Sequence, residues 1–213
     1  MGLFANAVGY LHDRDILHRR VTALASAIAP LLPKSARLLD VGCGDGLLDL
    51  ALLDLQPDLQ IEGVDVLVRP NTPIPVRQFD GSHLPFAAGE FDVAMAIDVF
   101  HHADDAVGLM QEMKRVTRRS LVIKDHLRHG FPSELILRAM DWVGNSRHGV
   151  RLPFSYWSEA EWRRTWDRCG IRPVSILRQL HLYPLPLSLI FERDLHFIAV
   201  LEPTGLPAPL EGE

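Results

Sequence analysis

Three glycines spaced two residues apart, Gly42, Gly44 and Gly46, follow a short apolar run and precede a leucine-rich segment. An apolar run of this length suits a buried parallel strand, and the segment from Leu47 onward suits a helix. Glycine lets the backbone turn sharply and approach a ligand that a Cβ would obstruct. The first N–H groups of the helix face this turn without partners inside the helix. The pattern therefore predicts a site for a nucleotide-like ligand at the carboxyl end of a strand.

The next predicted strand ends in a residue that could bind a ribose. Asp65 closes the apolar run that we expect to form a strand over 60–66. An acidic residue at this place can accept hydrogen bonds from both hydroxyl groups of a ribose. Dinucleotide sites use a similar acid, so Asp65 alone does not exclude NAD, and a solvent-exposed aspartate is the simpler alternative. The spacing G-x-G-x-G, instead of the dinucleotide pattern G-x-G-x-x-G, favours a ligand other than NAD.

Two motifs resemble one enzyme family. The stretch from Asp40 to Gly46, D-V-G-C-G-D-G, resembles the first motif of class I S-adenosylmethionine-dependent methyltransferases, an acidic residue and any residue before G-x-G-x-G. The phrase F-D-V at 91–93, followed by an apolar strand and a histidine, resembles the methyltransferase type 11 group. The resemblance covers roughly 36–201, with its specific motifs between Asp40 and His102. It implies S-adenosyl-L-methionine as cofactor and S-adenosyl-L-homocysteine as product.

The resemblance also implies cofactor contacts at the ends of four strands. Asp65 would hold the ribose hydroxyl groups, Asp80 would read the adenine amino group, and Asp98 would lie near the reacting methyl group. A simple turn role is the alternative for Asp80 and for Asp98. The residues that we predict to bind the cofactor are Asp40, Gly42, Cys43, Gly44, Gly46, Asp65, Val66, Asp80, Gly81 and Asp98.

Three residues at strand ends are candidates for acid–base chemistry. Asp125 and His126 directly follow the strand predicted over 120–124, at the end where ligands bind in parallel sheets. A histidine there titrates near neutral pH and could take a proton from an acceptor hydroxyl or amine group. His102, after the fourth strand, is the third candidate. Hydrogen bonding to loops is the alternative for Asp125 and His126, and packing is the alternative for His102.

Metal and disulfide chemistry are not expected. The histidines and aspartates within 101–105 could suggest a metal site, but nothing else in the sequence completes a set of ligands. Cys43 and Cys169 are far apart in the chain and fit neither a disulfide framework nor a zinc site. We therefore predict no metal ion.

The segment 127–157 is predicted to carry the specificity for the methyl acceptor, because the resembled family often builds a substrate lid there. Arg147 and His148 could hold an anionic or polar acceptor. Tyr156 and Trp157 could supply flat apolar walls. An ordinary surface loop with packing aromatic residues is the alternative for all four.

The elements that must position these residues form an α/β pattern. Strands are predicted over 38–41, 60–66, 75–79, 91–98, 120–124, 173–182 and 192–201, with helices after the first, fourth and fifth strands and from 158 to 169. Prolines at 70, 73 and 75 forbid a regular helix between the second and third strands. Together with the resemblance, this predicts a Rossmann-like three-layer sandwich around a seven-stranded, mostly parallel sheet with an antiparallel last strand.

A single domain over 1–213 is expected, with a helical segment over 1–33 and a loose tail over 203–213. Within the first segment, apolar residues recur at helical spacing over 10–32, and prolines end the helix. A basic cluster lies at 18–20. It either forms a solvated face or belongs to a helix that folds over the cofactor, with Tyr10, His12 or His18 near the methionine end.

Composition bounds the partners. A net charge of −5 and a pI of about 6.0 argue against a general nucleic-acid binder. No apolar run could span a bilayer, and the first residues lack the pattern of a signal peptide, so a cytoplasmic protein is expected. The link 183–191 is unusually apolar and could pack on the body, line the acceptor site or form a homodimer contact. We expect a small hydrophobic or aromatic acceptor.

Two other functions stay open at this point. An NAD-dependent oxidoreductase would share Asp65 but not the glycine spacing or the role of Asp80. A partner or regulatory subunit that binds S-adenosylmethionine without catalysis would keep the binding motifs and transfer no methyl group.

Overall fold

A computed structural model describes residues 17–145 and 154–204, and the side chains of all of these except 141–145. Residues 17–28 are helical and lead into a 3-10 turn, η1 (Ala29–Leu31). The strands are β1 (Arg37–Val41), β2 (Gln60–Asp65), β3 (Val76–Gln78), β4 (Phe91–Ile97), β5 (Thr117–His126), β6 (Ile171–Leu177) and β7 (His196–Pro203). The helices are α2 (Leu47–Leu55), α3 (Ala106–Val116), α4 (Phe131–Asn145), α5 (Glu159–Cys169) and α6 (Ser188–Phe191), and η2 (Phe100–His102) is a second 3-10 turn.

The seven strands form one sheet in the order β3-β2-β1-β4-β5-β7-β6. Neighbouring strands from β3 to β5 are parallel, whereas β7 is antiparallel to both β5 and β6. The predicted mostly parallel sheet with an antiparallel last strand is therefore confirmed. The strand order reverses between β1 and β4, and a crevice at the carboxyl ends of strands is the usual consequence of such a switch.

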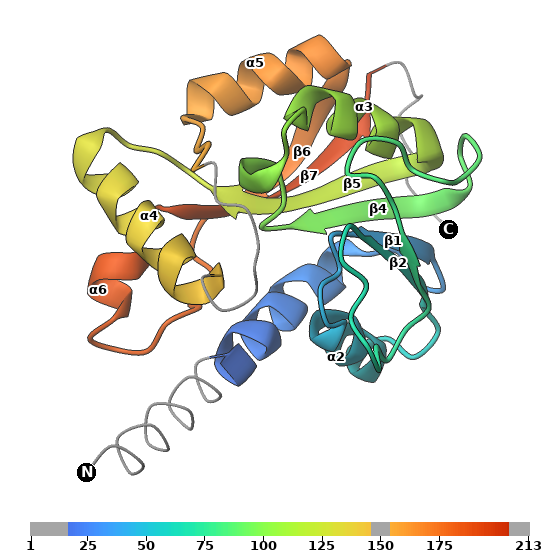
Figure 1. Cartoon of the computed structure of the whole chain (residues 1–213), viewed down its shortest axis with the longest axis horizontal. Coiled ribbons are helices and arrows are strands. Elements are labelled where there is room, and N and C mark those ends of the chain that lie inside the picture. The colour runs from blue at the N-terminus through green and yellow to red at the C-terminus, as the bar shows by residue number, and fades with distance from the viewer. Residues whose placement is uncertain (1–16, 146–153, 205–213) are drawn as a thin grey trace.

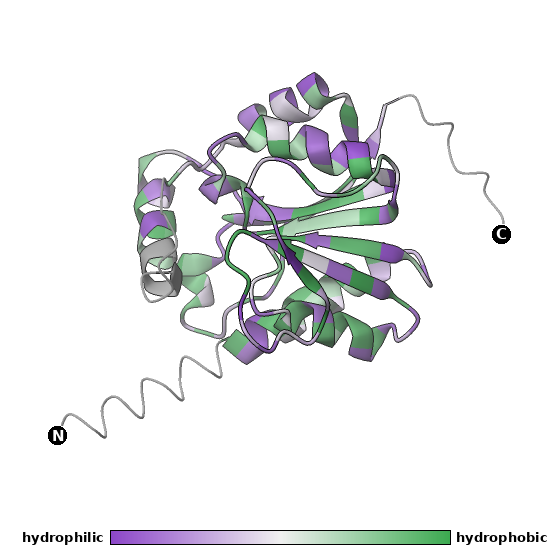
Figure 2. Ribbon diagram, turned by 45° about the vertical axis from the view of Figure 1, so that its right-hand side comes forward, coloured by the Kyte–Doolittle hydropathy of each residue, from purple (hydrophilic) through white to green (hydrophobic). Residues whose placement is uncertain are grey.

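Helices cover both faces of the sheet (Figure 1), which confirms the three-layer arrangement. On one face α3 and α5 pack on the strands, with Met113 and Trp162 among the buried residues. On the other face lie α2 and the helix over 17–28, where Ile28 and Leu52 are buried. Figure 2 shows the strands as largely apolar between these helices. Because successive strand residues alternate between faces, Leu38 joins one core and Leu39 the other, which explains the unbroken apolar run of β1.

The connection between β2 and β3 contains no helix, as the prolines predicted. Its first three residues, Val66, Leu67 and Val68, are 55%, 59% and 40% exposed. The helix over 17–28 lies instead beside α2, where Gln56 Nε2 donates to the carbonyl oxygen of Ala29 at 2.6 Å. Because no helix covers this connection, the side chain of Asp65 at the end of β2 remains accessible to a ligand in the crevice.

Several predicted boundaries are wrong by a few residues. β5 begins at Thr117, because the chain leaves α3 directly into the sheet, and Thr117 Oγ1 bonds the carbonyl oxygen of Met113 at 2.6 Å. β7 begins at His196 and not at 192, because residues 188–191 form the short helix α6. The helix α5 begins with a capping box: Ser158 accepts from the backbone N–H of Glu161, whose side chain accepts from the N–H of Ser158.

The segments α4 and α6 lie beyond the carboxyl end of the sheet, side by side (Figure 1). α4 occupies much of the predicted lid, whose residues Arg147 and His148 fall outside the described ranges. In the apolar link, Leu185, Leu189 and Ile190 are 75%, 64% and 49% exposed. None of the helices in the two described ranges combines the length and apolar character needed to cross a bilayer.

Candidate functional site

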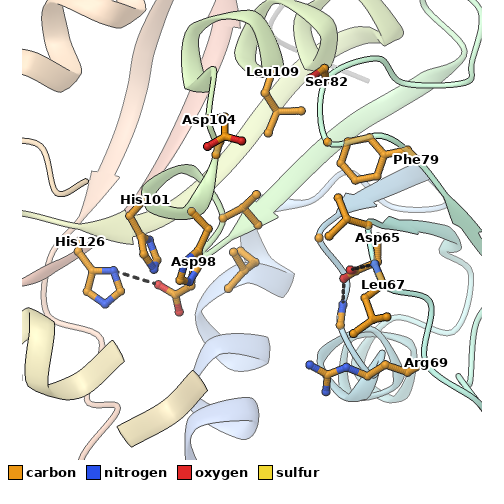
Figure 3. Close-up of a pocket in the computed structure, with 18 of the residues that line it drawn as sticks. Asp65, Leu67, Arg69, Phe79, Ser82, Asp98, His101, Asp104, Leu109 and His126 are labelled. Atoms are coloured by element: carbon orange, nitrogen blue, oxygen red, sulfur yellow. Dashed lines mark hydrogen bonds and ion pairs between the residues drawn. The ribbon is translucent and has the colours of Figure 1, made fainter. Parts of the chain in front are cut away.

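A cavity of about 570 Å³ lies across the carboxyl ends of the central strands. Its volume is within the ~300–1,000 Å³ that small-molecule sites usually have. Figure 3 shows side chains on two sides of it: Asp65, Leu67 and Arg69 on one, and Asp98, His101 and His126 on the other. The predicted cofactor residues that line the cavity are Gly42, Gly44, Asp65, Val66, Asp80, Gly81 and Asp98. Asp40, Cys43 and Gly46 are not among the residues that line it.

The glycine turn is built so that larger residues would not fit. Gly42 has a φ of +77°, and a Cβ there would lie 2.6 Å from a methyl carbon of Val99. Gly46 has a φ of +73°, and a Cβ would lie 2.9 Å from Pro73 of the proline-rich connection. Both positions therefore need glycine for conformation as well as for space. A bare backbone at Gly42 and Gly44 is consequently presented to the cavity.

Asp65 is fixed to this turn by its own carboxylate. Oδ2 accepts a hydrogen bond from the N–H of Gly44 and Oδ1 accepts one from the N–H of Leu67, both at 2.9 Å (Figure 3). A carboxylate has about four lone-pair sites, so each oxygen can still accept a further bond. Asp65 is therefore held in the cavity wall with acceptor capacity left for a pair of hydroxyl groups.

Asp80 forms a turn and also lies in the cavity wall. Its Oδ1 accepts from the N–H groups of Ser82 and His83, each at 2.7 Å, which is an Asx-type turn. The His83 N–H bond is the largest of the causes that lower the pKa of Asp80 to about 2. Asp80 and the following Gly81, with a φ of +85°, also line the cavity. The turn thus presents an ionised carboxylate beside the half-buried Phe79.

At the opposite end of the cavity, Asp98 is held between cations. Lys124 Nζ contacts Oδ1 of Asp98, and Arg20 Nη2 lies 3.4 Å from Oδ2. Burial raises the pKa of Asp98, but the charges of Lys124, His126 and Arg20 outweigh burial and hold this pKa well below its usual range. Asp98 has a φ of 59°, which aspartate tolerates better than most residues. Asp98 is therefore an ionised group at this end of the cavity.

Asp125 is a buried carboxylate shared by two histidines. Its Oδ1 lies 2.7 Å from Nδ1 of His101 and 3.3 Å from Nδ1 of His126, and Oδ2 accepts from the N–H of Phe100. Burial raises its pKa, but His101 and His126 hold the pKa well below the usual value. An ionised Asp125 requires a donor at Nδ1 of His101, which leaves Nε2 of that ring as the basic nitrogen. The sequence analysis named the neighbouring His102 as the candidate and missed His101.

The two histidines that were predicted to be catalytic also reach the cavity. His102 and His126 both line it, with the ring of His101 between theirs at centroid distances of 4.0 and 4.7 Å. Burial, and then the charge of Lys124, lower the pKa of His126, so His126 is neutral at pH 7. His126 is also held from behind, since its carbonyl oxygen accepts from the indole of Trp162 at 3.1 Å.

The predicted apolar walls lie behind the histidines and not on the cavity surface. Tyr156 is buried, with its ring 5.7 Å from that of His101 and 5.8 Å from that of His126. Trp157 packs on Trp162 at 4.7 Å between ring centroids. Neither Tyr156 nor Trp157 is therefore among the residues that line the cavity. Met140 from α4 and Tyr183 from the apolar link line the cavity instead.

The same cluster has the spacing of a metal site. One ligand-type atom from each of Asp98, His101, Asp125 and His126 lies within 4.8 Å of the others. The ammonium group of Lys124 bonds Asp98, and both oxygens of Asp125 accept hydrogen bonds. The positive charge of Lys124 therefore opposes a metal cation at this cluster.

Beneath the glycine turn lies a second buried carboxyl pair. Asp40 is 3% exposed, Asp49 on α2 is fully buried, and three of their four oxygens have no hydrogen-bond partner within the described ranges. Burial, and then the charge of Asp49, raise the pKa of Asp40, and burial raises that of Asp49 to about 7. The two groups therefore share a proton at neutral pH. Cys43 beside them is also buried, which raises the pKa of its thiol.

We expect Asp49→Asn to remove a pH dependence of stability. The pKa of Asp49 is about 7 in the folded state and about 3.9 in the unfolded state, so between these values the folded state binds more protons. The stability that this proton contributes is therefore lost as the pH rises toward 7. The free energy of unfolding of the wild type should fall by about 2–3 kcal/mol more than that of Asp49→Asn between pH 5 and pH 8. Urea unfolding at both pH values measures this. Asp54→Asn, on the exposed side of the same helix, is the control and should follow the wild type.

The fold and the cavity define a class of α/β proteins that bind their ligands at the carboxyl end of a mostly parallel sheet. Within that class, the chain belongs to the family of methyltransferase domains, which it matches over residues 10–176. S-adenosyl-L-methionine is therefore the cofactor, and the NAD-dependent alternative is set aside. The bare turn at Gly42 and Gly44 and the anchored Asp65 fit that cofactor.

Relatives agree with this assignment. The chain is 27% identical over 126 residues to 27-O-demethylrifamycin SV methyltransferase of Amycolatopsis mediterranei (strain S699), a match that covers 52% of this chain and 46% of that protein. The chain thus spans about half the length of this curated relative. Among solved structures, the protein in complex with the Trm112 methyltransferase activator of Haloferax volcanii is similar, with a TM-score of 0.71, 14% identity and coverage of 92% and 94%. A Thermotoga maritima S-adenosylmethionine-dependent methyltransferase has a TM-score of 0.64, 19% identity and coverage of 95% and 100%. At such low identity the two structures show the fold alone.

Proposed function

We propose that the protein transfers a methyl group to a hydroxyl group of a small acceptor that has an apolar or aromatic body. The observation that carries this proposal is the pairing of His101 Nδ1 with the buried, ionised Asp125 at 2.7 Å in the wall of the cavity. A histidine oriented in this way is suited to take a proton from a hydroxyl group, which must lose its proton on methylation.

The glycine turn, Asp65, Val66, Asp80 and Gly81 would hold the nucleoside part of the cofactor. When bound, S-adenosylmethionine supplies an electrophilic methyl group on its sulfonium centre. At the other end of the cavity, Asp98 would lie near the reacting methyl group of the cofactor. Positioning of the two reactants accounts for much of the rate that such a site can provide.

The proton would pass to Nε2 of His101. Asp125 keeps the Nδ1–H of that ring in place and stabilises the imidazolium that forms, because the carboxylate is ionised and 1% exposed. His126, the base predicted from the sequence, shares Oδ1 of Asp125 and would act as a second proton acceptor. His102 would contact the acceptor from the same wall.

The apolar body of the acceptor would contact Met140 and Tyr183. Other apolar residues of the wall are Ile97, Val99, Ala103 and Leu109. The Amycolatopsis relative is named for an acceptor that lacks an O-methyl group, which supports a hydroxyl as the acceptor class. The exposed leucines of the 183–191 link lie outside the cavity and do not support an apolar acceptor.

The test is a screen with methyl-labelled S-adenosylmethionine. Purified protein is incubated with phenols and hydroxylated polyketides, each beside its O-methylated counterpart, and the transfer of label and formation of S-adenosylhomocysteine are measured. The proposal expects transfer to hydroxyl compounds and none to their methylated counterparts.

A second candidate function is that of a partner protein that binds the cofactor without catalysis. The observation in its favour is that the Haloferax volcanii neighbour forms a complex with an activator. Saturable binding of S-adenosylhomocysteine without transfer to any acceptor would favour that candidate. Transfer that appears only with an added partner would instead favour an activated enzyme.

A further inference from the structure

His196 is a buried histidine that takes no part in the proposed proton transfer. It begins β7 directly opposite His126 of β5, and the centroids of the two rings are 5.0 Å apart. Burial lowers the pKa of His196 well below its usual value, so the ring is neutral. Its Nε2 lies 2.9 Å from the carbonyl oxygen of Phe191 and must carry the proton, because a carbonyl oxygen only accepts. His196 therefore ties the end of α6 to the strand that carries it.

The apolar link closes on itself beside this histidine. The N–H of Tyr183 donates to Oε1 of Glu192 at 2.8 Å, and the ring centroids of Tyr183 and Phe191 are 5.5 Å apart. Residues 183–192 thus form a short loop whose two ends lie together. None of the four residues of α6 within this loop is buried, so burial contributes little to holding the loop in place. Its hydrogen bonds to Glu192 and His196 consequently matter more.

The position of the 183–192 loop affects the cavity through Tyr183. This residue lines the cavity, and its ring centroid is 6.1 Å from that of His196. The guanidinium of Arg20, which contacts Asp98, lies over the same ring at 5.6 Å from its centroid. Tyr183 is therefore a wall of the end where Asp98 and the histidines lie, and a displaced loop would widen that end.

Resting on the proposed function, we infer that His196 is a positioning residue that limits the size of the methyl acceptor. Its hydrogen bond to Phe191 keeps the 183–192 loop closed, and the closed loop holds Tyr183 against the acceptor. Loss of this donor leaves the carbonyl oxygen of Phe191 without it and releases the loop. Small acceptors then lose a contact and larger ones gain room, whereas the nucleoside end of the cavity, around Asp65, is unchanged.

The first experiment measures the loop without any acceptor. The wild type, His196→Phe and His196→Gln are digested with chymotrypsin under native conditions, and cleavage after Leu189 and Phe191 is followed by mass spectrometry. His196→Phe keeps an aromatic ring but has no donor, so cleavage should be about 10-fold faster. His196→Gln can donate through its amide and should be digested at close to the wild-type rate. His181→Gln changes an exposed histidine just before the loop and is the control.

The second experiment measures the acceptor end. Protein saturated with S-adenosylhomocysteine is titrated with phenol and with the larger 4-phenylphenol. In His196→Phe the ratio of affinities should shift about 10-fold toward 4-phenylphenol, with the affinity for S-adenosylhomocysteine unchanged within about two-fold. For a small acceptor found in the screen, KM should rise while kcat stays within about three-fold, because the base remains in place.

Glu192→Ala provides the same test in a chain whose buried histidine is intact. It removes the hydrogen bond at the other end of the loop, so it should shift digestion and the affinity ratio in the same direction as His196→Phe.

Equal digestion of His196→Phe and the wild type overturns the inference, as does an unchanged affinity ratio in both His196→Phe and Glu192→Ala. If His196→Gln changes as much as His196→Phe, the donor is not what matters, and the inference is again overturned. A wild type that binds neither phenol after saturation with S-adenosylhomocysteine contradicts the proposed function, whereas the digestion rates still decide whether His196 holds the loop.

Discussion

Replacing Asp65 by alanine is expected to weaken the binding of S-adenosylhomocysteine about 100-fold. Under the proposed function, the carboxylate in the cavity wall would accept hydrogen bonds from two hydroxyl groups of a ribose, and hydrogen bonds to a charged group each contribute roughly 1.5–3 kcal/mol. Loss of both, partly offset by water, corresponds to ~2.7 kcal/mol. Asp65 also fixes the N–H groups of Gly44 and Leu67, so the turn loosens when the carboxylate is removed. Calorimetric titration measures the affinity.

Two further variants separate binding from folding. Asp65→Asn keeps one carbonyl oxygen for the turn and should lose affinity by a smaller factor. Glu62→Gln, on the same strand, removes an ion pair with Arg77 away from the cavity and should bind like the wild type. Unchanged affinity in Asp65→Ala, at an unchanged melting temperature, would contradict the assigned ribose contact.

The second large effect is expected at His101. His101→Gln should lower kcat by about 10²- to 10⁴-fold, the usual contribution of a general base, while affinity for S-adenosylhomocysteine changes little. Asp125→Asn should have a similar effect on kcat, because an amide can donate to Nδ1 and so favour the wrong tautomer of the ring. The measurement is the rate of methyl transfer to an acceptor found in the screen, with binding measured in parallel.

His102→Gln and His126→Gln decide between the neighbouring histidines. If either of them loses more rate than His101→Gln, the base lies at that residue and the role given to the His101–Asp125 pair is wrong. His181→Gln, an exposed histidine outside the cavity, is the control for general effects of the substitution. A full rate in both His101→Gln and Asp125→Asn would mean that the acceptor reacts without a protein base.

The strands could be predicted because their signal is local. The run of β1 is apolar without alternation, since Leu38 and Leu39 are buried on opposite faces, and the prolines at 70, 73 and 75 leave no regular helix before β3. The turn at Gly42 was equally readable, because only glycine fits there. By contrast, residues 188–191 were expected to belong to an apolar link and form the short helix α6, because a short apolar segment has no periodicity that would indicate a helix.

The roles of side chains were harder to predict, because they depend on residues distant in the chain. Nothing local distinguishes His101 from His102; the 3-10 turn η2 places the first against Asp125, 24 residues later. Arg20 sits in a basic cluster that is typical of a solvated face. The burial of Asp49 could have been predicted, because Asp49 lies three residues before the apolar Leu52 and therefore on the same, inward side of α2.

The last strand of the sheet enters between two strands that are already made. β7 lies between β5 and β6, opposite Asp125 and His126. As the chain is synthesised, the nucleotide-binding strands β1 to β3 are complete early, whereas the edge of β5 stays open until β7 emerges. A nascent chain therefore exposes a long apolar strand edge from the completion of β5 at His126 until β7 begins at His196, the kind of edge through which chains aggregate. The strand β5, which carries Asp125 and His126, thus depends on the synthesis of β7 for its second neighbour in the sheet.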